Sequence, residues 1–138
     1  MFTPTNISSM DEIAKMCKIV QDFCETHYEA DNANACVDRG QQLEQYMATI
    51  SKMYADAKHH KNTVLNGKFL DAVKKANDGY MSASTMNKYI DTLVADYDYL
   101  VDWTNRLNST CTHQLDFTRT VISKLKEEMR LAGWGVGK

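Results

Sequence analysis

The sequence predicts an all-α fold: an elongated, coiled-coil-like antiparallel helical bundle that forms a single domain over residues 1–138. Helix breakers are rare, since the chain holds one proline and six glycines, three of them in its last six residues. Apolar residues recur at alternating steps of three and four over long stretches. Residues typical of helix N-caps precede these stretches, and the length is sufficient for a core without disulfides or metal.

The first predicted helix covers residues 9–30. Residues 9–12 have the form of a capping box, in which the Ser9 hydroxyl accepts from the Glu12 amide and the Glu12 side chain reaches back. The apolar pattern then ends near the turn formers Asp31-Asn32. The positions of its apolar face are Met10, Ile13, Cys17, Val20, Cys24 and His27.

The second predicted helix covers residues 33–65. Asn32 or Asn34 would cap its start, and Asn66-Gly67 would supply a left-handed stop. Its apolar face is marked mainly by Cys36, Leu43, Met47, Ile50, Tyr54, Ala57 and Val64.

A short third helix is predicted over 68–77, closed by Asp78-Gly79. The last and longest helix then starts at Ser82 or Ser84 and covers about 84–132. We expect the third helix to cap one end of the bundle.

The longest helix carries an a/d heptad seam over residues 86–132. The phase of the seam jumps once, at Cys111, where two steps of four follow each other and unwind the supercoil without breaking a helix. Asn108-Ser109-Thr110 are weak helix formers and could mark a bend there, but we favour one helix. The glycine-rich tail 133–138 is expected to be loose.

The helix lengths predict a homo-oligomer. If the second and last helices are antiparallel neighbours, Lys58 lies level with about Asp91, and the second helix runs out near residue 33, level with about residue 116. The apolar seam would continue uncovered for about 24 Å at 1.5 Å per residue. Because such stripes are rarely left in water, we expect residues 115–132 to pack on another copy of the chain.

Composition argues against several classes of function. Sixteen basic and eighteen acidic residues give a formal charge of −2, so nucleic acid is not an expected partner. No segment resembles a signal peptide or a membrane span, and the four cysteines lack CxxC spacing, so we expect a cytoplasmic protein with no membrane partner. The sequence has no GxSxG, HExxH, Walker-type or GxGxxG motif, which predicts a protein that is not an enzyme and carries no cofactor.

The densest polar stretch, residues 103–119, predicts a ligand site. Arg106, Thr110 and His113 follow at steps of four and three and therefore share one helix face, with Arg39 of the second helix level with them. An aromatic plate, arginines and hydroxyl donors suit a nucleobase plus a phosphate. The predicted ligand-binding set is Arg39, Trp103, Arg106, Asn108, Thr110, His113 and Arg119.

Other interpretations of this region stay open. The polar stripe could make ordinary interhelical hydrogen bonds or simply be solvated. A metal could be held by Cys24, Cys36, Cys111, His27 and His113 if they met in one layer. Because Cys36 and Cys111 occupy heptad positions, where a cysteine behaves as a small hydrophobe, we predict no metal site.

Two segments, MYADAKHH at 53–60 and NSTCTHQLD at 108–116, resemble parts of small helical proteins of unknown function encoded by tailed bacteriophages and prophages. The resemblance runs from about residue 10 to residue 132. It implies a phage context, with the host-cell cytoplasm as the place of action. It transfers no catalytic or binding residue.

Three hypotheses about function follow. The first is a non-enzymatic phage protein that binds and sequesters a small anionic ligand, namely a nucleotide signal of host antiviral defence. The second is a helical protein–protein interaction module, an adaptor or inhibitor of a host or phage protein that uses residues 115–132. The third, an accessory of DNA metabolism, is the weakest, because the net charge is negative and basic residues alternate with acidic ones.

Overall fold

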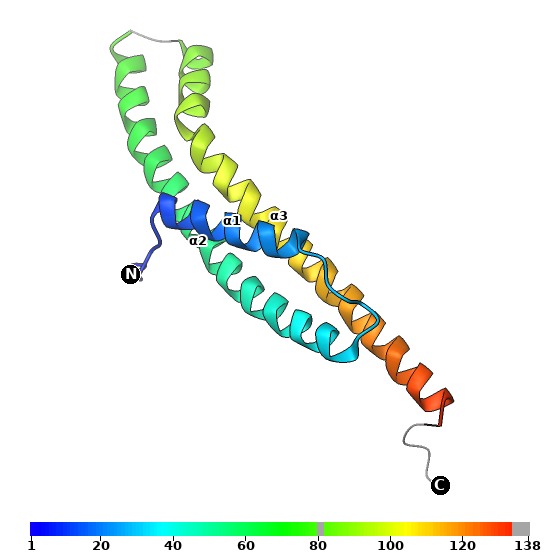
Figure 1. Cartoon of the computed structure of the whole chain (residues 1–138). Coiled ribbons are helices and arrows are strands. Elements are labelled where there is room, and N and C mark those ends of the chain that lie inside the picture. Colours follow the sequence, from blue (N-terminus) through cyan, green and yellow to red (C-terminus); the bar gives the residue numbers. More distant parts are fainter. Residues whose placement is uncertain (80–81, 134–138) are drawn as a thin grey trace.

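The computed structural model describes residues 1–79 and 82–133, and within them it confirms the all-α prediction, with no strand. Three helices, α1 (Met10–Glu25), α2 (Ala33–Asn77) and α3 (Ala83–Leu131), make up this part of the chain. α2 and α3 form a long antiparallel hairpin, and α1 lies along its middle (Figure 1). No described helix is long and apolar enough to span a membrane. Residues 134–138 of the predicted loose tail lie outside the described residues.

The helix starts agree with the predicted caps, because a side-chain oxygen accepts a hydrogen bond from a backbone amide in the first turn of each helix. These bonds join Ser9 Oγ to Glu12 N at 3.1 Å, Asn32 Oδ1 to Ala35 N at 3.0 Å and Ser82 Oγ to Thr85 N at 3.2 Å.

The end of α1 differs from the prediction. We expected this helix to reach residue 30, but it ends at Glu25, and Thr26 is extended. The Thr26 hydroxyl donates to the carbonyl oxygen of Asp22 at 2.7 Å. Residues 26–32 form a loop instead, because a threonine side chain can bond a nearby carbonyl that would otherwise accept from the next turn.

α2 runs without interruption through the predicted stop at Asn66-Gly67, so the prediction of separate helices over 33–65 and 68–77 is wrong. Among the described glycines, Gly79 and Gly133 have a positive φ and Gly67 does not. Glycine permits the left-handed conformation without requiring it. The hairpin turn therefore follows residue 77.

α3 confirms the prediction of one very long helix, with bounds one residue from those expected. Its buried positions step by four from Leu100 to Thr104 and by three to Leu107, then by four to Cys111 and again by four to Leu115. This is the predicted phase jump, and the helix passes it without a break.

The core lies where α1 covers the hairpin. On α2 the buried apolar positions recur every seven residues, so one stripe faces the other two helices. α1 contributes one buried stripe of three residues. The stripe of α2 is Cys36, Leu43, Ile50 and Ala57, that of α1 is Ile13, Cys17 and Val20, and all seven have no exposed surface.

The register of the hairpin also differs from the prediction. We expected Lys58 level with about Asp91, whereas Lys61 Nζ forms an ion pair with Asp98 Oδ1 at 2.6 Å. The offset arises because the turn follows residue 77 and not residue 65. α2 therefore covers more of α3 than the sequence suggested.

The stretch 115–132 is consequently covered at its start, which corrects the expectation of a wholly exposed seam. Leu115 and Thr118 are 7% and 1% exposed and lie against Gly40 of α2. From residue 126 on, α3 is exposed, and its end runs past the start of α2 (Figure 1).

Candidate ligand-binding cavity

A cavity of about 530 Å³ opens where α1 ends, between the loop 26–32 and α3. Its lining comes from the last turn of α1, the loop, α2 and one face of α3. The residues are Cys24, Glu25, Thr26, His27, Tyr28, Ala30, Arg39, His113, Gln114 and Phe117.

The buried cation that lines this cavity is the Arg39 guanidinium, and Arg39 is only 6% exposed. Its Nη2 donates to the carbonyl oxygen of Cys24 at 3.3 Å and to Gln114 Oε1 at 2.9 Å. The Arg39 Cζ lies 4.1 Å from the ring centre of Phe23 and 4.9 Å from that of Tyr28. These contacts fix the group where all three helices and the loop meet.

The charge of Arg39 has no carboxylate partner within 4 Å among the described residues. Its Nε is buried and has no hydrogen-bond acceptor. Burial of an unpaired charge is costly, and cation–π contacts return only about 1–2 kcal/mol each. The guanidinium therefore keeps unused capacity to attract an anion.

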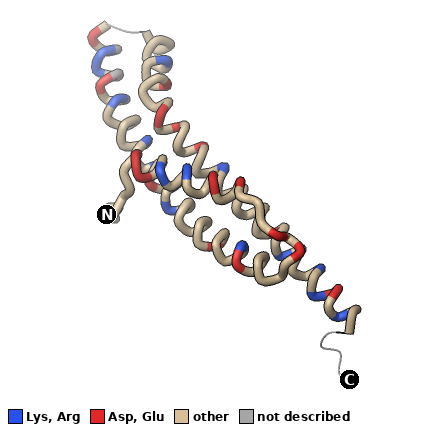
Figure 2. The backbone as a smooth tube through the Cα atoms, viewed as in Figure 1, with Lys and Arg blue, Asp and Glu red and all other residues tan. Residues whose placement is uncertain are grey.

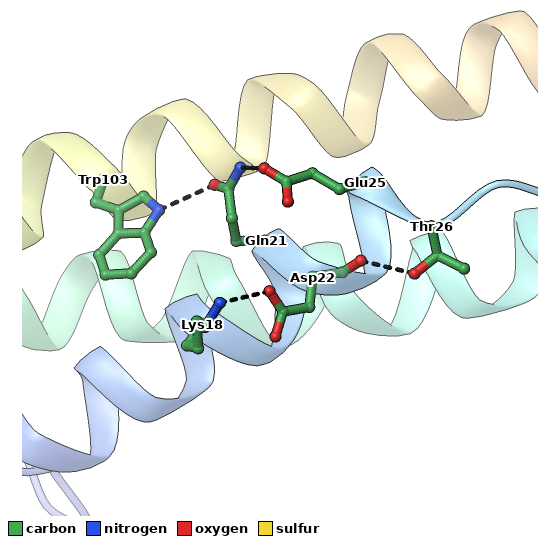
Figure 3. A network of polar contacts seen from close by, with 6 residues as sticks. All are labelled: Lys18, Gln21, Asp22, Glu25, Thr26 and Trp103. Carbon is green, nitrogen blue, oxygen red and sulfur yellow. Dashed lines mark hydrogen bonds and ion pairs between the residues drawn. The ribbon is translucent and has the colours of Figure 1, made fainter.

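Glu25 lines the cavity, but its carboxylate is engaged elsewhere. Glu25 Oε1 accepts from Gln21 Nε2 at 2.7 Å, and Gln21 Oε1 in turn accepts from Trp103 Nε1 (Figure 3). The imidazoles of His27 and His113 lie exposed at the rim and can donate or accept hydrogen bonds. The lining thus combines one buried cation with polar donors and aromatic rings.

Two residues of the predicted ligand-binding set, Arg39 and His113, line this cavity. Arg119 lies at a different, smaller hollow of about 160 Å³. Its guanidinium there faces Glu44 at 3.7 Å and Asp116 at 3.6 Å, all of them exposed. Arg119 is therefore already offset by two carboxylates.

Trp103 and Asn108 make contacts between helices. Trp103 Nε1 donates to Gln21 Oε1 at 3.2 Å (Figure 3). The centre of the indole ring lies 5.9 Å from that of the Tyr99 ring. Asn108 Nδ2 donates to Ser51 Oγ at 2.7 Å and joins α3 to α2. For these two, the plainer interpretation of interhelical hydrogen bonding fits the geometry.

Arg106 and Thr110 share the face of His113 but lie nearer the middle of α3. Arg106 is exposed and Thr110 half-buried. Seven residues of helix separate Arg106 from His113, about 10 Å along the axis. The structure therefore does not gather the seven predicted residues around one cavity.

Sequence reasoning missed the aromatic part of the site. Tyr28 was assigned to the first helix, so its position over Arg39 could not be foreseen. Phe23 and Phe117 carried no signal beyond helical spacing. Gln114 was part of the polar stretch, and its position next to His113 on α3 was the only hint of its role.

The cysteines give no metal centre among the described residues, where no group of three or more potential metal ligands occurs. Cys24 and Cys111 do meet, with their Sγ atoms 3.7 Å apart. Cys36 is buried away from this pair, with its thiol 3.5 Å from the carbonyl oxygen of Ala30.

A scan against protein-family models and searches of curated proteins and of solved structures found no match to this chain. The resemblance to phage proteins therefore stays a prediction, and function must be argued from the chain's own residues.

Proposed function

We propose that this protein is a non-enzymatic binder of a small anionic ligand, and that the ligand occupies the cavity beside Arg39. The supporting observation is a buried guanidinium without a carboxylate partner that lines an accessible cavity. A bound anion would supply the missing counter-charge in a site of low dielectric, where such pairing is strong.

The other lining residues favour a ligand with a flat ring as well as a charge. The volume of about 530 Å³ falls within the ordinary range of ligand pockets. Phe117, 59% exposed, and Tyr28 offer ring surfaces, and Gln114 offers an amide. A nucleotide has both features, and the phage resemblance makes a nucleotide signal of host antiviral defence our candidate for sequestration.

Isothermal titration calorimetry with inorganic phosphate, AMP, a cyclic dinucleotide and uncharged adenosine tests this proposal. We expect the charged nucleotides to bind and adenosine to bind more weakly. Arg39→Gln should lower nucleotide affinity about tenfold or more, because a hydrogen bond to a charged group contributes about 1.5–3 kcal/mol. Phe117→Ala, at an exposed position, should lower the affinity for AMP and leave the affinity for phosphate unchanged.

Arg130→Gln is the matched control. It removes the same charge from an exposed arginine that pairs with Glu127 near the end of α3. Binding should be unaffected. No binding by any probe at millimolar concentration, or an equal loss in the control, would contradict the proposal.

A second candidate is an interaction module that uses the end of α3, with another copy of this chain as the occupant. Met129 and Leu131 are 45% and 71% exposed where α3 runs past α2. Multi-angle light scattering should give a dimer mass that Leu131→Lys reduces to a monomer. Ile19→Lys, at a 49% exposed position on α1, should leave the dimer intact. A monomeric wild-type chain would exclude this candidate.

The DNA-accessory hypothesis gains no support from the charge distribution. Basic and acidic positions are interspersed along the helices (Figure 2). Nucleic-acid-binding proteins instead gather lysine and arginine on one face.

A further inference from the structure

We propose that Cys24 and Cys111 are a redox modification site and form a reversible disulfide when the protein meets a peroxide. Their Sγ atoms, from α1 and α3, lie 3.7 Å apart. A disulfide has an S–S distance of about 2.05 Å, so the two atoms must approach by about 1.7 Å. This inference does not depend on the ligand proposed above.

The position of Cys24 allows such an approach. It lies in the last turn of α1, one residue before the helix ends, and the loop 26–32 follows. Helix ends and loops open more easily than packed helix interiors. Cys111, fully buried in the middle of α3, can stay in place while Cys24 moves.

Access differs between the two thiols and sets the order of reaction. Cys24 is half-buried and lines the cavity, so a small oxidant that enters the cavity reaches this residue before Cys111. Cys111 has no exposed surface. Cys24 is therefore the attacking thiol and Cys111 the resolving one.

The surroundings also favour a thiolate at Cys24. The hydrogen bond from Cys111 lowers the pKa of Cys24 below the ordinary thiol value, and Arg39 adds to this, although burial and Glu25 oppose it. The same hydrogen bond, together with burial, raises the pKa of Cys111. One proton is thus shared between two sulfurs, with the negative charge on the one nearer the cavity.

Hydrogen peroxide is the oxidant we specify. The Cys24 thiolate attacks one peroxide oxygen and the O–O bond breaks, which gives a sulfenic acid at Cys24. The hydroxide that leaves takes up the proton released when the Cys24 thiol ionised and becomes the first water. The sulfur of Cys111 then attacks the Cys24 sulfur, and the departing hydroxide takes the Cys111 proton as water. Two thiols lose two electrons, and one peroxide becomes two waters.

The other two cysteines serve as an internal control, because we expect them to stay reduced. Cys17 is fully buried in the core, and burial raises its pKa to about 11. Cys36 is also buried, and burial together with Asp31 raises its pKa. Protonated, inaccessible thiols react slowly with peroxides, so both should stay reduced.

The test treats the reduced full-length protein with a small excess of hydrogen peroxide and then alkylates it with N-ethylmaleimide in denaturant. Intact mass spectrometry should show two adducts where the untreated protein shows four. Peptide mapping should join the peptides of Cys24 and Cys111, and dithiothreitol should restore four adducts.

Variants separate this pair from general oxidation. Cys24→Ala, a truncation at a half-buried position, should abolish the link and leave three alkylated thiols after oxidation. Cys17→Ala and Cys36→Ala should retain the link. Four adducts after peroxide, a link that involves Cys17 or Cys36, or a link between chains would overturn the proposal.

Oxidation of the pair should also change ligand binding in the cavity, an expectation that rests on the proposed function. The carbonyl oxygen of Cys24 accepts from Arg39 Nη2 and from Gln114 Nε2, the latter at 2.9 Å. Movement of Cys24 would disturb both bonds and change AMP affinity. A mapped disulfide in a protein that does not bind AMP would count against the proposed function alone, whereas AMP binding without a disulfide would count against the redox site alone.

Discussion

Replacement of Gly67 by alanine tests whether α2 is continuous, because the substitution stabilises the protein only if residue 67 lies inside a helix. Gly67 lies ten residues before the end of the helix, without a positive φ. A Cβ at this position would meet no atom within 4 Å. Glycine inside a helix is less stable than alanine by about 0.5–1 kcal/mol, and nothing in the surroundings offsets that gain. Gly67→Ala should therefore stabilise the protein by about that amount.

Thermal and urea unfolding, followed by circular dichroism, measure the effect. For a chain of this length, about 1 kcal/mol corresponds to a rise in Tm of about 3–5 °C. Gly79→Ala is the matched control, because Gly79 has a φ of 80°. Alanine in that left-handed conformation should destabilise by about 1–2 kcal/mol. If Gly67→Ala were the destabilising change, the helix would stop there and the described hairpin would be wrong.

Two further predictions concern stability. Burial raises the pKa of Asp56, but hydrogen bonds from Lys52 and the Ser8 amide hold that pKa below its ordinary value. Asp56→Asn should therefore destabilise by about 1–3 kcal/mol at pH 7, and the difference from wild type should disappear as the pH falls through the lowered pKa in urea unfolding. Leu43→Ala, at a fully buried site, should lower the free energy of unfolding by about 2–5 kcal/mol. Leu131→Ala, at an exposed site, should change it by less than about 0.5 kcal/mol.

The parts of the fold that the sequence could predict are those set by local rules. The caps at Ser9, Asn32 and Ser82 depend on a side chain and an amide only three residues apart. The core positions depend on a seven-residue spacing within each helix, which can be recognised without knowing how the helices align. α3 was predictable because apolar positions at steps of three and four continue past the phase jump at Cys111.

The errors arise where competing local signals need a tertiary context to decide between them. Asn66-Gly67 reads as a stop, yet a helix continues when its neighbour α3 packs alongside. His27 fits the period of α1, but the Thr26 hydroxyl bonds a carbonyl of the last turn and the chain leaves the helix. The misplaced turn then shifted the register of the hairpin and lengthened the predicted uncovered seam.

Only part of the candidate site was predictable, because some of its residues depend on the loop that follows α1. Arg39 and His113 were expected at one level of the bundle, and both line the cavity. Tyr28 could not be expected there, since its position over the guanidinium requires the loop that sequence reasoning had assigned to a helix. Trp103 was assigned to the ligand because an aromatic ring near arginines suits a nucleobase, and the sequence gives no sign of its partner Gln21 on α1.

The central claim, that the Arg39 guanidinium receives an anion, can be tested at that residue by NMR. Spectra of arginine side-chain N–H groups would be recorded while AMP is added to the ¹⁵N-labelled protein. The account predicts a saturable shift of the Arg39 signal together with the side-chain amide of Gln114, while Arg130 stays constant. An unchanged Arg39 signal, with small unsaturable shifts at exposed arginines, would contradict it.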